Sequence, residues 1–166
     1  INADLFGEEA ARAMVVHYDY TVLAGTQGAR NHYKQDRMFE LALRFRMPIV
    51  LFGEGGGGRP GDDSTGPAVA FDTHTFTQFS KLSGAVPMVG VNHGRCFAGN
   101  TALLACCDVI IATKDSTIAM GGPAMIEGGG LGSYTPEEVG PMSFQVPNGV
   151  VDILVEDEAE AVRVAK

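Results

Sequence analysis

Two glycine-bearing turns, each preceded by an apolar stretch, hold the residues of this chain best suited to chemistry. The first turn follows Ile49–Phe52 and the second follows residues 86–92. Glycine has no Cβ, so its backbone N–H can approach a ligand closely. If neighbouring parallel strands bring both turns to one place, two N–H groups can point at one carbonyl oxygen and stabilise the negative charge that develops on it. The candidate donors are Gly56, Gly57, Gly58, Ala98 and Gly99.

The surroundings of the second turn favour this oxyanion-binding role, although the glycines could also serve only to permit tight turns. The apolar residues 97–106 predict a helix whose N-terminal dipole would attract an anionic oxygen. The side chains offer no convincing Ser-His-Asp triad or pair of carboxylates. His93, beside the second turn, could transfer a proton, but a hydrogen-bonded structural histidine is the more common case.

The elements that must position these turns alternate between strand and helix. This order predicts an α/β fold with a mostly parallel sheet flanked by helices. Residues 30–46 show an amphipathic helical pattern, and its apolar face holds Met38, Leu41, Ala42 and Phe45. The expected strands are residues 13–18, 49–52, 86–92, 109–112, 117–120 and 150–155, and the expected helices are residues 3–12, 30–46, 69–82, 97–106, 123–127 and 156–166.

Composition limits the kind of protein this can be. A length of 166 residues favours one domain. The chain is 45% hydrophobic and 19% charged, and this composition supplies enough apolar residues to build a core. The net charge of -8 disfavours a nucleic-acid partner. We find no signal-peptide pattern and no apolar run long enough to cross a membrane. The chain begins at Ile1 and ends within an expected helix, so we expect a fragment of a longer polypeptide.

The sulfur-containing residues predict core packing rather than chemistry. The three cysteines are Cys96, Cys106 and Cys107. They lack the CxxC spacing of zinc or redox sites, so we expect no metal and no disulfide, and small buried thiols in a reducing cytoplasm. We also expect the methionines, Met120 and Met125 among them, to fill gaps in the core.

The residues around the second turn resemble a known signature. Asn92-His93-Gly94, then Ala98-Gly99, an apolar helix and an apolar strand that follows Cys107-Asp108 are similar to the crotonase superfamily. Residues 15–166 more closely resemble the carboxyltransferase β subunit of biotin-dependent acyl-CoA carboxylases, of the propionyl-CoA carboxylase type. The stretches that carry this resemblance are Asp19-Tyr20-Thr21-Val22, Gly56-Gly57-Gly58-Arg59 (the family's Gly-Gly-Ala-Arg loop), Cys96-Phe97-Ala98-Gly99 (its Cys-Ala-Gly-Gly turn) and Glu137-Glu138-Val139-Gly140.

This resemblance implies a crotonase-like (ClpP/crotonase) ββα superhelix, with residues 1–166 forming one N-terminal carboxyltransferase domain of a tandem pair. It implies that the domain binds an acyl-CoA and stabilises its enolate with backbone amides. Carboxybiotin on a separate carrier, either a biotin carboxyl carrier protein or a biotin carboxylase subunit, would supply the CO2. It further implies a homo-oligomer with the active site between subunits.

Four side chains are candidate substrate contacts under this resemblance: Arg30, Lys34, Arg59 and Phe97. The three cations could meet the phosphates of CoA, although solvated helix charges are common and Arg59 could instead anchor its loop. Phe97 could shape the acyl pocket.

Departures from the family pattern keep two alternatives open. Ala98 stands where the family has glycine, and Gln145 stands where a histidine is usual. The alternatives are another crotonase-type acyl-CoA enzyme, such as a decarboxylase or isomerase, and a non-catalytic assembly domain. A hydratase is disfavoured, because Asn100 occupies the region where that class carries a glutamate. We expect Glu127 to lie on the surface.

Overall fold

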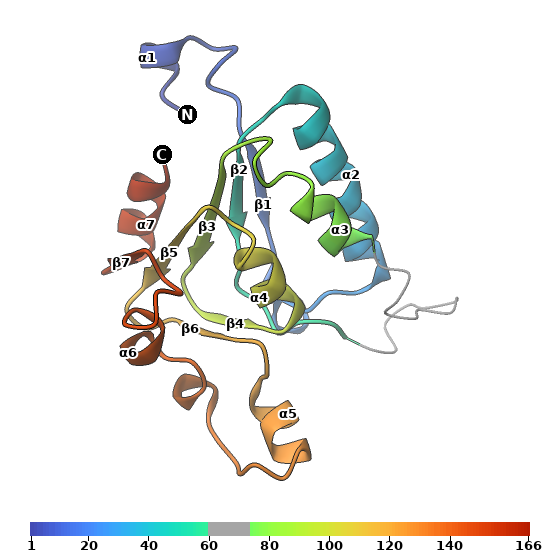
Figure 1. Ribbon diagram of the computed structural model, residues 1–166, viewed down its shortest axis with the longest axis vertical. Coiled ribbons are helices and arrows are strands. Elements are labelled where there is room, and N and C mark those ends of the chain that lie inside the picture. The colour runs from blue at the N-terminus through green and yellow to red at the C-terminus, as the bar shows by residue number, and fades with distance from the viewer. Residues whose placement is uncertain (60–73) are drawn as a thin grey trace.

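Five parallel strands form the central sheet of the protein, in the order β1-β2-β3-β5-β7 (Figure 1). The computed structural model describes residues 1–59 and 74–166. The strands are β1 (Met14–His17), β2 (Ile49–Phe52), β3 (Met88–Asn92), β4 (Arg95–Phe97), β5 (Val109–Thr113), β6 (Thr117–Ala119) and β7 (Ile153–Val155). The helices are α1 (Ala3–Phe6), η1 (Leu23–Gly25), α2 (Ala29–Phe45), α3 (Thr75–Ser80), α4 (Gly99–Leu104), α5 (Pro123–Gly128), η3 (Pro136–Glu138), α6 (Met142–Gln145) and α7 (Glu158–Ala165).

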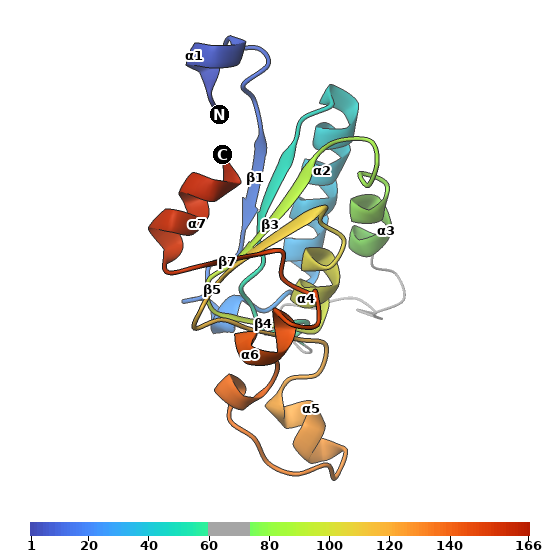
Figure 2. The ribbon, with the colours of Figure 1, turned by 60° about the vertical axis from the view of Figure 1, so that its left-hand side comes forward.

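One face of the sheet packs against α2, α3 and α4 (Figures 1 and 2). Phe39 of α2 and Phe79 of α3 are fully buried there, with ring centroids 4.7 Å apart. Helix α4 lies unusually close to β3, since a Cβ at Gly90 would be 2.6 Å from Leu104 Cδ1. Gly90 therefore lets α4 approach the sheet, and this brings the start of α4 near the ends of the strands.

Helix α7 covers part of the opposite face of the sheet (Figure 2). Ala161 of α7 packs against Val91 and Ile111 of the central strands β3 and β5. The edge strand β1 is less covered on this side, where Val15 is 49% exposed. Strands β2 and β3 are thus buried on both faces, which explains why they read as continuous apolar runs.

A second, smaller parallel sheet of β4 and β6 continues from the carboxyl ends of the main strands. The chain therefore repeats a strand–strand–helix unit, first as β3–β4–α4 and then as β5–β6–α5. This is the ββα arrangement that the resemblance implies. Isolated bridges extend the small sheet to the first glycine turn, by pairing Gly55 with Cys96 and Gln27 with Gly58.

Three expected elements differ from the structure. The helix expected at residues 3–12 ends at Phe6, because Gly7 has a φ of +80° and its N–H donates to Ala3 O, which closes the helix. Phe97 ends strand β4 rather than beginning a helix, since its N–H donates to Gly55 O at 2.9 Å. The strand expected at residues 150–155 is limited to Ile153–Val155.

Burial on the helices also differs from expectation in places. Phe45, expected on the buried face of α2, is exposed, and Phe39 takes the core position instead. Within the helix expected at residues 69–82, residues 69–73 lie outside the described part of the chain, and the described helix is Thr75–Ser80.

The segment from 120 to 145 projects from the end of the molecule furthest from the chain termini (Figure 1). Met120, Met125 and Leu131 are 60%, 67% and 73% exposed on it, so the prediction that these two methionines fill the core is wrong. The segment returns to the main body at Gln145, whose Nε2 donates to Ile118 O. Gln145 thus holds the segment on strand β6.

Candidate functional site

The two glycine turns lie against each other, as the sequence predicts. A Cβ built on Gly57 would be 2.6 Å from Ala98 Cβ and 3.5 Å from Gly99 N. The small sheet holds them there, because Gly55 N–H donates to Arg95 O at 2.8 Å and Gly55 O accepts from Phe97 N–H at 2.9 Å. Two turns separated by about forty residues in sequence therefore share one place at the carboxyl edge of the main sheet.

Three of the five candidate amides are engaged within the protein. Gly56 N–H donates to Ala24 O at 3.0 Å, and Ala98 N–H donates to Ala119 O at 3.2 Å. The third is Gly57 N–H, which donates to Asn100 Oδ1 at 2.9 Å.

Gly58 and Gly99 supply the remaining two amides, and neither has a hydrogen-bond acceptor among the described residues. Gly99 is the first residue of α4, so its N–H is one of the unpaired donors at the positive end of that helix. The expected dipole contribution therefore starts at Gly99 rather than at Phe97. Gly58 and Gly99 are therefore the two candidate amides that remain available to donate to a ligand.

Ala98 adopts a backbone conformation that L-residues rarely tolerate, with φ 51° and ψ -119°. Glycine stands at this position in the family turn, where the conformation is unstrained. The strain is held by neighbours: the Ala98 amide is bonded to Ala119 O, and Thr101 Oγ1 donates to the same carbonyl at 3.0 Å. The turn that carries Gly99 is therefore tied to strand β6.

The turn that follows β1 supports the first glycine turn from behind. Asp19 Oδ1 accepts from Thr21 N–H at 3.0 Å and from Thr21 Oγ1 at 2.6 Å, and these bonds lower the pKa of the Asp19 carboxyl. Gly25 follows with a φ of +63°, and a Cβ there would lie 3.0 Å from Glu54 O. The close approach of these backbones explains why glycine is needed at position 25.

The predicted substrate contacts are dispersed around this pair of turns. Arg59 Nη2 donates to Asn31 Oδ1 at 3.2 Å and Nη1 donates to Thr26 O, so Arg59 anchors the first turn to the start of α2. Arg30 and Lys34 lie exposed on α2. Phe97 is only 7% exposed. A role for any of these four in binding substrate stays a prediction.

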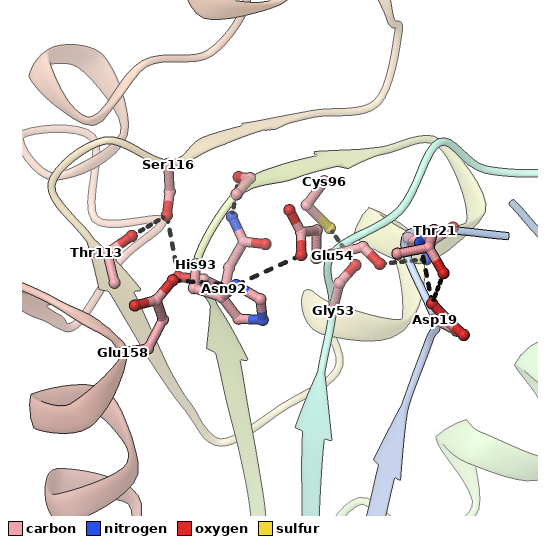
Figure 3. A network of polar contacts seen from close by, with 12 residues as sticks. Asp19, Thr21, Gly53, Glu54, Asn92, His93, Cys96, Thr113, Ser116 and Glu158 are labelled. Atoms are coloured by element: carbon pink, nitrogen blue, oxygen red, sulfur yellow. Dashed lines mark hydrogen bonds and ion pairs between the residues drawn. The ribbon is translucent and has the colours of Figure 1, made fainter. Parts of the chain in front are cut away.

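His93 makes polar contacts at the carboxyl edge of the sheet (Figure 3). Its Nδ1 lies 3.4 Å from Glu54 Oε2 and 3.9 Å from Glu158 Oε1, and its ring meets Phe52 edge-on at 6.2 Å. A cavity of about 260 Å³ opens beside it, lined also by Val15, His17 and Tyr18.

Glu127 is exposed, as expected.

The buried thiol of Cys96 lies beneath the same edge. Its Sγ contacts Gly53 O at 3.0 Å, and burial raises its pKa to about 12 (Figure 3). Burial also raises the pKa of Cys107 to about 12 and that of Cys106 in the same direction. All three cysteines are unpaired, and Cys96 is buried as expected, whereas Cys106 and Cys107 are only partly buried.

The sequence analysis did not identify two polar groups near the site, those of His32 and Tyr18. His32 Nδ1 lies 3.0 Å from the hydroxyl of Thr75, which donates to Asp36 Oδ1 at 2.6 Å, and burial lowers the pKa of His32. Tyr18 is the second, with its hydroxyl accepting from the amides of Gln27 and Gln35 at 2.7 and 2.6 Å. Burial raises the pKa of Tyr18 to about 12.

Within residues 1–59 and 74–166, no group of histidine, cysteine, aspartate and glutamate side chains is arranged to hold a metal ion. In the same part of the chain, every helix is too short or too polar to cross a membrane.

Comparison with known proteins gives a consistent result. A family model described as "Carboxyl transferase domain" matches residues 9–166. A solved single-chain, multi-domain long-chain acyl-CoA carboxylase is 62% identical with a TM-score of 0.93, over 99% of this chain and 16% of that one. The transcarboxylase 12S structure, a hexamer assembly with methylmalonyl-CoA and methylmalonic acid bound, is 27% identical with a TM-score of 0.75, over 91% of this chain and 30% of that one.

The curated relatives are longer proteins. The biotin-dependent 3-methylcrotonyl-CoA carboxylase beta1 subunit of Mycobacterium tuberculosis (strain ATCC 25618 / H37Rv) is 28% identical over 159 residues, which is 93% of this chain and 30% of that protein. The chain thus spans about three-tenths of the length of that relative. The solved structures confirm the expected α/β, crotonase-like fold class.

Proposed function

This chain belongs to the carboxyl transferase domain family, and from that premise we propose that it binds an acyl-CoA thioester and stabilises its enolate during carboxyl transfer from carboxybiotin. Removing the proton beside the thioester carbonyl places negative charge on the carbonyl oxygen. Two positioned N–H donors stabilise that charge, and losing one such donor typically costs about 3 kcal/mol of transition-state stabilisation.

The observation that carries the proposal is the pair of amides at Gly58 and Gly99. Their turns are in contact, and both N–H groups lack an acceptor among the described residues. A Cβ at Gly58 would meet no described atom within 4 Å, so the described residues leave open space beside this glycine. Carboxybiotin, bound on a separate carrier domain or subunit, would supply the CO2. The protein's own part is to bind the thioester and hold the enolate oxygen.

We propose a long-chain acyl-CoA as the substrate class. Support comes from the solved relative at 62% identity, which is a long-chain acyl-CoA carboxylase. Arg30 and Lys34, exposed on α2, are proposed contacts for the CoA phosphates. We propose Arg59 as an anchor of the first turn and Phe97 as part of the wall that supports the second.

We further propose that residues 1–166 act as the N-terminal member of a pair of carboxyltransferase domains in a homo-oligomer. The solved 12S relative is a hexamer assembly. The projecting segment of this chain carries exposed apolar side chains suited to a subunit contact, including Met125, Leu131 and Phe144. Three unpaired cysteines support a location in the reducing cytoplasm.

The test is a carboxylation assay on the full-length protein. Purified protein is mixed with biotin carboxylase, biotinylated carrier, ATP, labelled bicarbonate and acetyl-, propionyl- or palmitoyl-CoA in turn. We expect acid-stable label in the acyl-CoA fraction, greatest with palmitoyl-CoA and absent when the carrier is omitted. Carrier-independent decarboxylation of a carboxylated acyl-CoA would instead favour a decarboxylase. No label with any substrate, together with no acyl-CoA binding by calorimetry, would favour the non-catalytic alternative.

A further inference from the structure

We propose that Asn100 is a positioning residue that aims the Gly58 N–H of the oxyanion site by holding Gly57. This inference rests on the proposed function, because it assigns a role within the same site. Asn100 follows Gly99 directly in sequence, and its side chain reaches the other turn. One residue therefore connects both of the turns that supply the free amides.

The side chain of Asn100 has no exposure to solvent and contacts three backbone groups on two separate segments, the first glycine turn and the turn at Gly25. Its Oδ1 accepts the Gly57 N–H at 2.9 Å, and its Nδ2 lies 3.5 Å from both Gly25 O and Glu54 O. These partners are 43, 75 and 46 residues away in sequence. A buried carboxamide without partners is costly, so these contacts hold the two segments close to the start of α4.

Asn100 affects the orientation of the Gly58 N–H through Gly57. The Gly57 N–H is fixed by Asn100, and the Gly57 carbonyl accepts from Gln27 N–H at 2.7 Å. In a trans peptide the C=O and the following N–H point in opposite directions, so the Gly58 N–H faces away from the Gln27 backbone. Gly57 has a φ of +87° and, as glycine, can rotate readily. Without the bond from Asn100, the peptide before Gly57 loses this anchor, and the peptide that carries the Gly58 N–H depends on the bond between Gln27 N–H and Gly57 O.

Asparagine suits this position better than the side chains closest to it in shape. The position needs one acceptor, for the Gly57 N–H, and one donor group facing two carbonyl oxygens, and a carboxamide provides both. Leucine of similar volume provides neither. The space is also tight, since a Cβ at Gly55 would be 2.1 Å from Asn100 Nδ2, so the longer glutamine does not fit.

Asn92 provides a matched control. It is as fully buried as Asn100, and its Nδ2 donates to two backbone carbonyls, Gly94 O at 2.9 Å and Thr117 O at 3.3 Å. Among the residues that the structure describes, the Asn92 side chain contacts no N–H group of the two turns. Replacing Asn92 therefore reports the cost of losing a buried carboxamide without disturbing Gly57.

The experiment compares Asn100→Ala, Asn100→Asp and Asn92→Asp with the wild type in the full-length protein, using the carboxylation assay across a range of pH. For Asn100→Ala we expect kcat to fall by about 10- to 1,000-fold, approaching the loss of one oxyanion donor. We expect KM for acyl-CoA to change by less than about threefold, because binding of CoA uses other groups.

The aspartate variant separates a positioning role from a purely structural one. When protonated, the new carboxyl at position 100 keeps an acceptor for Gly57 N–H and an O–H donor for the facing carbonyls. When ionised, it places negative charge against the oxygens of Gly25 and Glu54, and burial raises the pKa at which this occurs. We therefore expect a fall of kcat with rising pH that neither the wild type nor Asn92→Asp shows.

The outcomes distinguish this inference from the proposed function. A wild-type protein that transfers no carboxyl group overturns the proposed function and this inference together. An active wild type with an Asn100→Ala kcat within about threefold of it, or with the same loss and pH profile in Asn92→Asp, overturns the inference alone. If Asn100→Ala does not fold, the pH profile of Asn100→Asp decides: a kcat independent of pH overturns the inference, and the expected fall supports it.

Discussion

Replacing Gly57 by alanine puts a methyl group between the two turns, where the structure has no room for it. The new Cβ would lie 2.6 Å from Ala98 Cβ, and the residue that carries it, at position 57, has a φ of +87°. The positive φ costs an L-residue about 1–2 kcal/mol, and forcing apart packed segments costs about 1–3 kcal/mol. We therefore expect the free energy of unfolding to fall by about 2–5 kcal/mol.

The neighbouring substitution Gly58→Ala is the matched control. Gly58 has no positive φ, and a Cβ there meets no described atom within 4 Å. It also recreates the Gly-Gly-Ala-Arg order of the family loop. We expect this variant to change the free energy of unfolding by no more than about 0.5 kcal/mol.

Both variants are measured by urea denaturation followed by circular dichroism. In the full-length protein, amide hydrogen exchange of strands β2 and β3 then shows whether the loss occurs in this domain. A Gly57→Ala variant as stable as Gly58→Ala would mean that the two turns are not in contact, and the argument for a shared oxyanion site would fail.

Three further outcomes follow from the backbone strain and the pKa shifts. Ala98→Gly should raise the free energy of unfolding by about 0.5–1 kcal/mol, because relief of strain exceeds the added entropy of the unfolded chain; a loss of stability in urea would contradict this. Because burial lowers the pKa of His32 below its ordinary 6.5, the unfolded chain binds the proton more readily, and stability should fall as pH drops below 6.5. His32→Gln should flatten that dependence, and an unchanged slope in denaturation curves between about pH 5 and 7 would exclude His32 as its source. Cys96, with a pKa of about 12, should react with iodoacetamide at least about 100-fold more slowly in the native than in the unfolded protein, and rapid native labelling would show that the thiol is accessible.

The alternation of strand and helix was predictable because β2 and β3 are buried on both faces and α2 is amphipathic. The meeting of the two turns was also predictable, since parallel strands end at one edge of a sheet. Which of the candidate amides are hydrogen-bonded within the protein was not predictable. Gly56 and Ala98 look as suitable as Gly58 and Gly99 in sequence, and only the bonds to Ala24 O and Ala119 O set them apart.

Other misses have identifiable physical causes. Phe97 is an apolar residue before an apolar helix. The neighbouring sequence gives no sign of the bond from its N–H to Gly55 O, which makes Phe97 the end of a strand. Asn100 left a signal that could have been used. A carboxamide inside the largely apolar residues 97–106 needs buried partners, and this need marks it as a contact to another segment.

The long sequence separations between Asn100 and its partners have a consequence for biogenesis. As the ribosome extends the chain, Gly25, Glu54 and Gly57 are made well before the side chain that binds them, the most distant of them 75 residues earlier. Nascent chains that stop short of residue 100 lack the bond that fixes Gly57. The donor pair that we propose is therefore completed only after residue 100 has been made, and a product truncated before that residue lacks the contacts that fix Gly57.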